Sequence, residues 1–122
     1  MAITILKQGR VLIVSMPASM TDMDLVQLRD ELADRVGRLR SSGVVIDVSG
    51  LDVMDSFATR MLRGIAHTTR LRGAETVIVG IQPDVAFAMS QLGLALDDVA
   101  TALDLEEGLE LAQAPPRAEM RR

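Results

Sequence analysis

Residues 44–58 read Val-Val-Ile-Asp-Val-Ser-Gly-Leu-Asp-Val-Met-Asp-Ser-Phe-Ala, and this stretch decides the fold of the 122-residue chain. Its first five residues are almost continuously apolar, which is typical of a strand buried on both faces of a sheet. A loop follows from Ser49 to Asp55, and from Ser56 apolar residues recur at helical spacing. A buried strand that leads through a short loop into a helix is the building unit of α/β domains.

The pattern of strand and helix continues on both sides of this stretch. A hairpin through Gly9 and Arg10 precedes it, followed by an amphipathic helix that Thr21 or Asp22 caps and that closes with Arg38, Arg40 and Gly43. The remaining predicted elements are a helix from Ser56 to near Gly73, a strand over 75–81, a helix from Pro83 to near Gly93, a short strand over 99–102 and a helix from Asp104.

The order β-β-α-β-α-β-α-β-α predicts a single α/β domain, a small and mostly parallel β-sheet with helices packed on it. We expect this domain to span residues 1–112. Residues 113–122 carry two prolines and three arginines without apolar periodicity, and we expect them to form a frayed C-terminal tail.

Composition excludes several classes of function. The chain is 48% apolar but only 2% aromatic, and 13 basic against 17 acidic residues give a net charge of −4. A nucleic-acid binder needs clustered cations and aromatic stacking platforms, so we expect no nucleic-acid partner. No cysteine and one histidine leave no thiolate or His–His metal site. Without a signal peptide or an apolar run long enough to span a membrane, we expect a cytoplasmic protein with no membrane partner.

Catalytic motifs are missing as well. The sequence has no P-loop, no dinucleotide-binding glycine pattern and no nucleophile elbow. Asp47 lies on a strand, like the phosphate-accepting aspartate of a receiver domain. The sequence lacks the lysine after a later strand and the acidic pair after the first strand that such a domain also needs. His67 has no carboxylate four residues away on its helix and is interpreted as a surface or helix-end histidine. We therefore expect no enzyme activity, no cofactor and no catalytic residue.

Asp52, Asp55 and Ser56 are the chemically interesting residues of the central stretch. Ser56 stands where a helix begins, so its hydroxyl is expected to cap that helix. The same hydroxyl is a candidate phosphate acceptor, because a phosphate at a helix start meets free N–H groups and the positive end of the helix dipole. Asp52 and Asp55 either solvate the loop and favour the helix start or, less simply, bind a metal ion.

These residues carry a resemblance to a known family. The segment from Ile46 to Ala58 resembles the STAS domains of anti-sigma factor antagonists. Residues 55–67 and the Gly-Ile-Gln-Pro-Asp-Val-Ala segment at 80–86 look more particularly like the small scaffold proteins of the bacterial stressosome. The resemblance covers about residues 1–112.

The resemblance implies a non-enzymatic antagonist in a stress-response pathway. Such a protein self-associates and assembles with an RsbR-like STAS co-antagonist into a large complex, sequesters an RsbT-like serine/threonine kinase and releases it when phosphorylated. Ser56 matches the family's phosphorylated serine. Asp52, Asp55 and Thr59 surround it and are expected to contact the partner.

Two other functions are compatible with the sequence. The chain could bind an anti-sigma factor kinase one-to-one, as a plain antagonist with the same fold. It could also be a small-molecule binder or an enzyme that uses Asp52, Asp55 and Ser56.

Overall fold

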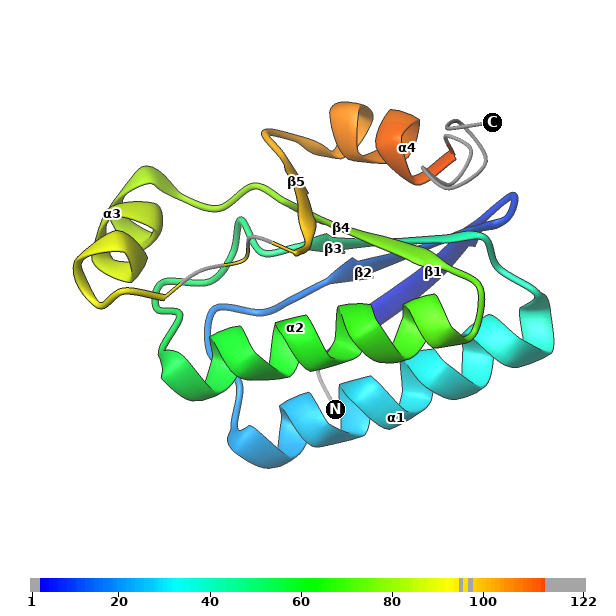
Figure 1. Cartoon of the computed structure of the whole chain (residues 1–122), viewed down its shortest axis with the longest axis horizontal. Coiled ribbons are helices and arrows are strands. Elements are labelled where there is room, and N and C mark those ends of the chain that lie inside the picture. The colour runs from blue at the N-terminus through cyan, green and yellow to red at the C-terminus, as the bar shows by residue number, and fades with distance from the viewer. Residues whose placement is uncertain (1–2, 95, 97, 114–122) are drawn as a thin grey trace.

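The fold is a five-stranded sheet with helices on both faces (Figure 1). The computed structural model describes residues 3–94, 96 and 98–113. The strands lie in the order β1-β2-β3-β4-β5, with β1 antiparallel to β2 and the other neighbours parallel. The elements are β1 (Thr4–Gln8), β2 (Val11–Ser15), α1 (Asp22–Leu39), β3 (Gly43–Asp47), α2 (Ser56–Leu71), β4 (Glu75–Val79), α3 (Pro83–Gln91), β5 (Ala100–Ala102) and α4 (Leu105–Gln113).

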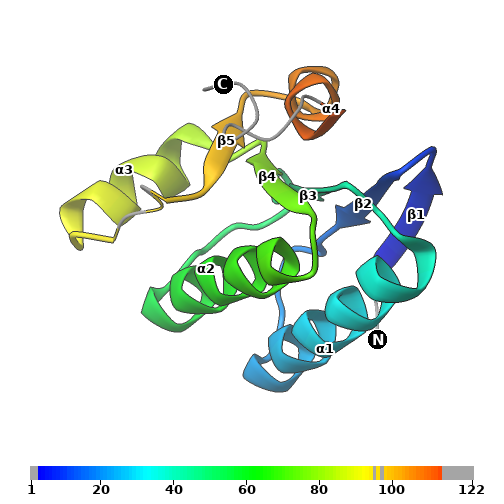
Figure 2. The ribbon, with the colours of Figure 1, turned by 45° about the vertical axis from the view of Figure 1, so that its right-hand side comes forward.

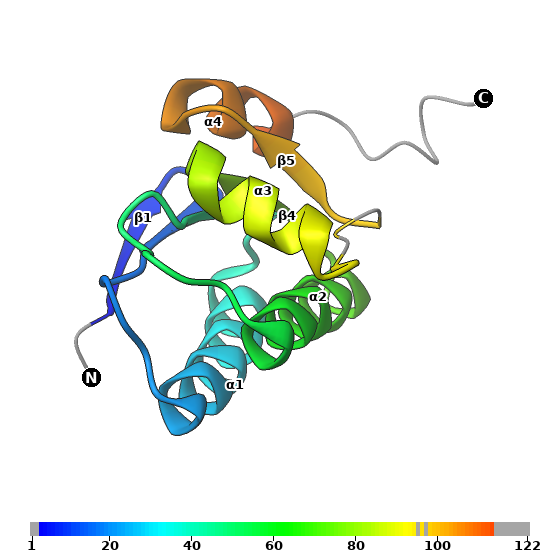
Figure 3. The same ribbon diagram turned by 90° about the vertical axis from the view of Figure 1, so that its left-hand side faces the viewer.

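The helices divide unequally between the two faces. Helices α1 and α2 lie side by side on one face and α4 lies on the other, as the turned views show (Figures 2 and 3). Helix α3 packs with the α1–α2 side, since Val85 and Met89 belong to the same apolar cluster as the buried leucines of α1. One face therefore carries the large core, and the other carries a small core under a single short helix.

Strand β3 at the centre of the sheet joins these two cores. Val44 and Ile46 point into the large core, whereas Val45 points into the small one beneath α4, and all three are fully buried. This alternation follows from the two-residue period of a strand, which sends successive side chains to opposite faces. The prediction of a strand buried on both faces is confirmed.

Helix α4 approaches the sheet closely because glycine stands at two contact points. A β-carbon on Gly43 would lie 2.6 Å from the carbonyl oxygen of Ala112 in α4. A β-carbon on Gly108 would collide with the Cγ1 atom of Val79. The expectation that Gly43 closes α1 is wrong: α1 ends at Leu39, Arg40 adopts the left-handed cap conformation with φ 50°, and Gly43 begins β3.

The predicted element order is otherwise confirmed across the described residues. Thr21 caps α1, with its hydroxyl and the Asp24 carboxylate each accepting the other residue's backbone N–H. The strand predicted over 75–81 ends earlier, at Val79, because Gly80 turns the chain away with φ +79°. The expected tail lies outside the described residues from 114 onward, and α4 includes Gln113.

We predict opposite effects of the same substitution at two helical glycines. Gly108→Ala should lower the free energy of unfolding by about 1–3 kcal/mol, because overpacking against Val79 outweighs the better helix propensity of alanine. Gly64→Ala on α2 should raise it by about 0.5–1 kcal/mol, since nothing lies within 4 Å of the added carbon. Urea denaturation of both variants measures the pair. Stabilisation by Gly108→Ala would contradict the close packing of α4.

Candidate functional site

The candidate site is the loop between β3 and α2, residues 48–55, together with the first turn of α2. It leaves the sheet at the carboxyl end of β3, the end at which open α/β sheets place their binding sites. Figure 1 shows this loop at the same end of the sheet as α3. Leu51 and Met54 are buried in the large core, whereas Asp52 and Val53 face solvent, Val53 with 71% of its surface exposed. The loop is thus anchored by two apolar side chains and exposes those between them.

Asp55, and not Ser56, caps α2. The Asp55 Oδ1 atom accepts a 2.8 Å hydrogen bond from the backbone N–H of Ala58, and its carbonyl oxygen accepts one from the N–H of Thr59. The expectation that the Ser56 hydroxyl makes this cap is therefore wrong. Asp and Ser are about equally good caps, and here the helix begins one residue earlier than a serine cap requires. Ser56 is the first helical residue and is exposed, so its hydroxyl is not needed to hold the helix end.

Thr59 lies inside the molecule. Its surface is 2% exposed, and its hydroxyl donates a 2.9 Å hydrogen bond to the carbonyl oxygen of Asp55. This position does not fit the expectation that Thr59 contacts a partner, because the side chain is turned toward the core and engaged in the first turn. Thr59 instead holds Asp55 in place. Asp52, Asp55 and Ser56 are exposed beside one another as the sequence indicates.

Gln82 braces the loop from the neighbouring strand connection, a role that the sequence reasoning did not assign to it. Its side-chain amide donates hydrogen bonds of 2.7 Å to the Ser49 carbonyl and 3.1 Å to the Leu51 carbonyl. Gly80 makes this approach possible, since a β-carbon there would lie 2.9 Å from that of Ser49. The Gly-Ile-Gln-Pro segment therefore pins the β3–α2 loop. The available sequence signal was the position of Gln82 directly before Pro83, which begins α3. In the structure the Gln82 side chain does not cap α3, and it is therefore free to bind the loop.

A cavity of about 310 Å³ opens beside the loop, between it and the connection from β2 to α1. Apolar side chains form much of its wall and carboxylates stand among them; the lining includes Met16, Met20, Leu25, Leu51, Asp22, Asp52 and Asp55. Such a hollow suits a side chain with an apolar body better than a small anion, which the three carboxylates would repel.

The other residues considered from the sequence lie elsewhere. His67 is exposed on α2, about three turns from Ser56. Asp47 accepts a 2.9 Å hydrogen bond from the Ser49 N–H and so shapes the start of the loop. Within the described part of the chain, no group of three or more histidine or acidic residues is placed to hold a metal ion, and no helix is long and apolar enough to cross a membrane.

Comparison with known proteins identifies the family. The protein-family model of the STAS domain matches residues 2–108 of the sequence. The chain is a STAS-domain protein. The resemblance drawn from the central stretch and the Gly-Ile-Gln-Pro segment is therefore confirmed, and so is the single mostly parallel α/β domain.

This STAS protein is similar to RsbS, to a chain of the stressosome and to RsbT co-antagonist proteins. RsbS from Moorella thermoacetica, in a serine-to-glutamate variant, superimposes with a TM-score of 0.78 at 33% identity and full coverage of both chains. A chain of the stressosome, described as a signal integration and transduction hub, gives 0.75 at 34% identity, covering 98% of this chain and 100% of that one. The RsbT co-antagonist protein RsbRA of Bacillus subtilis (strain 168) is 30% identical over 86 residues, 70% of this chain; the match covers only 31% of RsbRA.

We predict that the free energy of unfolding depends on the Asp55 side chain far more than on the side chains of Asp52 and Ser56. Asp55→Ala should lower the free energy of unfolding by about 1 kcal/mol through loss of the cap. Ser56→Ala and Asp52→Ala should each change it by less than about 0.5 kcal/mol, because both side chains are exposed. Urea denaturation of the three variants compares them. A larger loss for Ser56→Ala than for Asp55→Ala would return the cap to Ser56.

We predict that Gln82→Met loosens the β3–α2 loop without displacing α3. Methionine keeps the length of the side chain but donates no hydrogen bond, so two loop carbonyls lose their partner and stability falls by about 1–2 kcal/mol. Amide hydrogen exchange should accelerate in residues 49–55 more than in α3. Gln91→Met, at the exposed end of α3, serves as the control and should leave the loop unchanged. Unchanged loop exchange in Gln82→Met would show that the brace contributes nothing.

Proposed function

We propose that this STAS protein is a non-enzymatic stressosome scaffold that holds an RsbT-like serine/threonine kinase at the β3–α2 loop. Phosphorylation of Ser56 by that kinase releases it, in concert with an RsbR-like co-antagonist. The observation that carries the proposal is the exposed hydroxyl of Ser56 at the first position of a helix that Asp55 already caps. Full-length similarity to RsbS supports the assignment to the scaffold.

The first turn of α2 can accommodate a phosphate. The N–H of Ala58 is taken by the Asp55 side chain and that of Thr59 by the Asp55 carbonyl. The N–H groups of Ser56 and Phe57 come before these in the helix, where no carbonyl of the preceding turn can accept them. A phosphate on Ser56 can therefore accept hydrogen bonds from the helix start and benefits from the helix dipole.

The same phosphate changes the surface that a partner would meet. It adds roughly −1.5 to −2 charges beside the exposed carboxylates of Asp52 and Asp55. A kinase surface fitted to the unmodified loop, with the apolar side chain of Val53 at its centre, then faces extra bulk and charge. Because Leu51, Met54 and Gln82 anchor the loop from beneath, the phosphate alters the surface and not the fold.

We expect Ser56 to be the acceptor in a phosphorylation assay. The protein is incubated with the RsbT-like kinase of its own genome and ATP, and mass spectrometry maps the phosphate. Ser56→Ala should abolish labelling while still binding the kinase. Ser49→Ala, an exposed serine on the same loop, is the matched control and should be labelled like the unaltered protein. Undiminished labelling of Ser56→Ala would overturn the site.

We expect Ser56→Asp to weaken kinase capture by about tenfold or more, since it places a charge in the interface. Its unfolding curve should match that of the unaltered protein, because the residue is exposed and aspartate favours a helix start. Unchanged kinase binding by Ser56→Asp would contradict the proposal that a charge at this position releases the kinase.

Sizing the protein with an RsbR-like co-antagonist separates the scaffold from a one-to-one antagonist, because only the scaffold enters a large particle.

A further inference from the structure

Helix α2 presents only positive charge to solvent. Its sixteen residues include no aspartate or glutamate. Its outward side chains lie at positions three or four apart, which places them along one exposed stripe of the helix. This basic stripe consists of Arg60, Arg63, His67 and Arg70, all exposed.

Helix α4 presents the opposite charge. Its nine residues include three glutamates, Glu106, Glu107 and Glu110, and no lysine, arginine or histidine. All three glutamates are exposed. Three exposed leucines border them: Leu105 and Leu111 in the helix, 38% and 43% exposed, and Leu103 shortly before it, 85% exposed. This acidic stripe is therefore mixed with apolar surface, as protein interfaces are.

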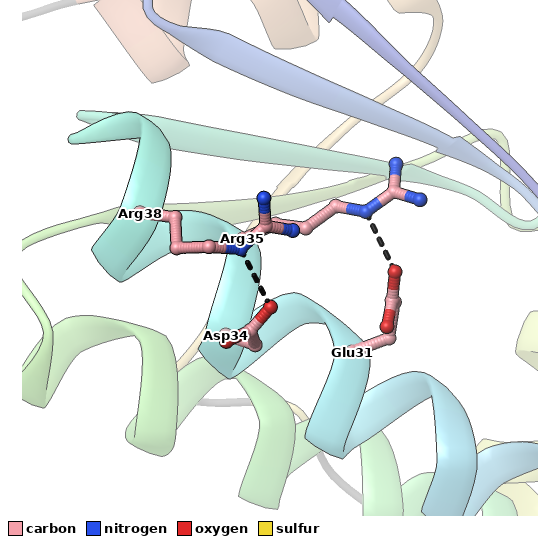
Figure 4. A network of polar contacts seen from close by, with 4 residues as sticks. All are labelled: Glu31, Asp34, Arg35 and Arg38. Carbon is pink, nitrogen blue, oxygen red and sulfur yellow. Dashed lines mark hydrogen bonds and ion pairs between the residues drawn. The ribbon is translucent and has the colours of Figure 1, made fainter.

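Helix α1 shows what a self-compensated helix looks like in the same protein. Arg35 pairs with Glu31 at 2.7 Å and Arg38 pairs with Asp34 at 2.8 Å, each four residues apart along the helix (Figure 4). These two arginines of α1 thus find their counter-charges on the same helix. The stripes on α2 and α4 cannot do so, because each helix lacks residues of the opposite sign.

Pairs with neighbouring segments neutralise the stripes only in part. Arg63 lies 3.4 Å from Asp98 and Arg70 lies 3.5 Å from Glu75, but all four side chains are about half exposed, so these pairs are weak. On α4, Glu107 accepts a 3.3 Å hydrogen bond from the N–H of Leu103 near the helix start. No such contact with a described residue engages Arg60, Glu106 or Glu110.

The two stripes lie on opposite faces of the sheet and cannot meet within one molecule (Figures 2 and 3). We propose that they bind each other between copies of this chain, the basic stripe of α2 on one copy against the acidic stripe of α4 on the next. Charge complementarity selects the partner, and the exposed Leu71 at the end of α2 and the leucines beside α4 supply apolar contact.

Such a contact joins two different surfaces and is therefore heterologous. An open assembly of copies always has one unoccupied basic stripe at one end and one unoccupied acidic stripe at the other. Association therefore continues until a ring closes or a larger array forms. The contact supplies surfaces for the self-association expected of a stressosome scaffold and in that respect rests on the proposed function, but it needs neither the kinase nor Ser56 phosphorylation. It should weaken as salt rises, because exposed charges are screened over a Debye length of about 10 Å at 0.1 M salt.

Charge reversal tests the contact with the purified chain alone. Sedimentation velocity at low ionic strength should show concentration-dependent association of the unaltered protein. The double variants Arg60→Glu with His67→Glu and Glu106→Arg with Glu110→Arg should each weaken association by about tenfold or more, since attraction becomes repulsion. Mixing the two variants should restore association, because each reversed stripe then meets its complement on the other variant.

Asp30→Arg with Asp84→Arg is the matched control, with the same change of net charge as the α4 variant but on α1 and α3. It should associate like the unaltered protein, and circular dichroism should show all variants folded. Failure of the mixed variants to associate would overturn the proposal, as would an unaltered chain that stays monomeric at low ionic strength. Neither result depends on kinase binding, so the contact and the proposed function fail separately.

Discussion

The structure depends on the burial of β3 on both faces. Val44 and Ile46 must be covered by α1 and α2, and Val45 must be covered by α4, so one strand holds the two layers of helices together. The cover on the α4 side is thin, and it is close only because glycine stands at positions 43 and 108. Burial of apolar surface is the main favourable contribution to folding, at about 25 cal/mol for each Å². The position of α4, and hence of its acidic stripe, follows from that short-range packing.

The same strand fixes the loop that follows it. The chain leaves β3 at Asp47 and has only a short distance to the start of α2, whose place is set by packing against α1 and the sheet. Leu51 and Met54 enter the core on the way, and the Gln82 amide donates hydrogen bonds to two carbonyls of the loop. What stays exposed is a small and well-defined surface around Ser56. A covalent change there would meet a loop that these contacts hold in place, which is what the proposed switch requires if binding is to change while the domain stays folded.

Much of this could be read from the sequence, because the signals are local. The apolar run at 44–48 and the helical spacing after Ser56 each depend on residues that are close in the chain, and they predicted the element order. Signals between adjacent residues were ambiguous: Asp55 and Ser56 are both good caps, and only the backbone decides between them. The burial of Thr59 is not evident from the sequence, because the packing of α2 on α1 and the sheet decides which face of that helix is covered. The Gln82 brace joins segments about thirty residues apart, and no local pattern encodes that contact.

The charge stripes illustrate the same division between sequence and structure. That α2 lacks acids and α4 lacks bases is visible in the sequence, but their placement on opposite faces requires the topology. The surface proposed to bind the kinase and the basic stripe adjoin at the start of α2. Ser56 and Arg60 are four residues apart on α2 and both are exposed, so a phosphate on Ser56 would lie within reach of the arginine one turn on. A phosphate that pairs with Arg60 removes the first cation of the basic stripe from contact with a neighbouring copy. Modification of one serine would then act on kinase binding through the loop and on assembly through the helix.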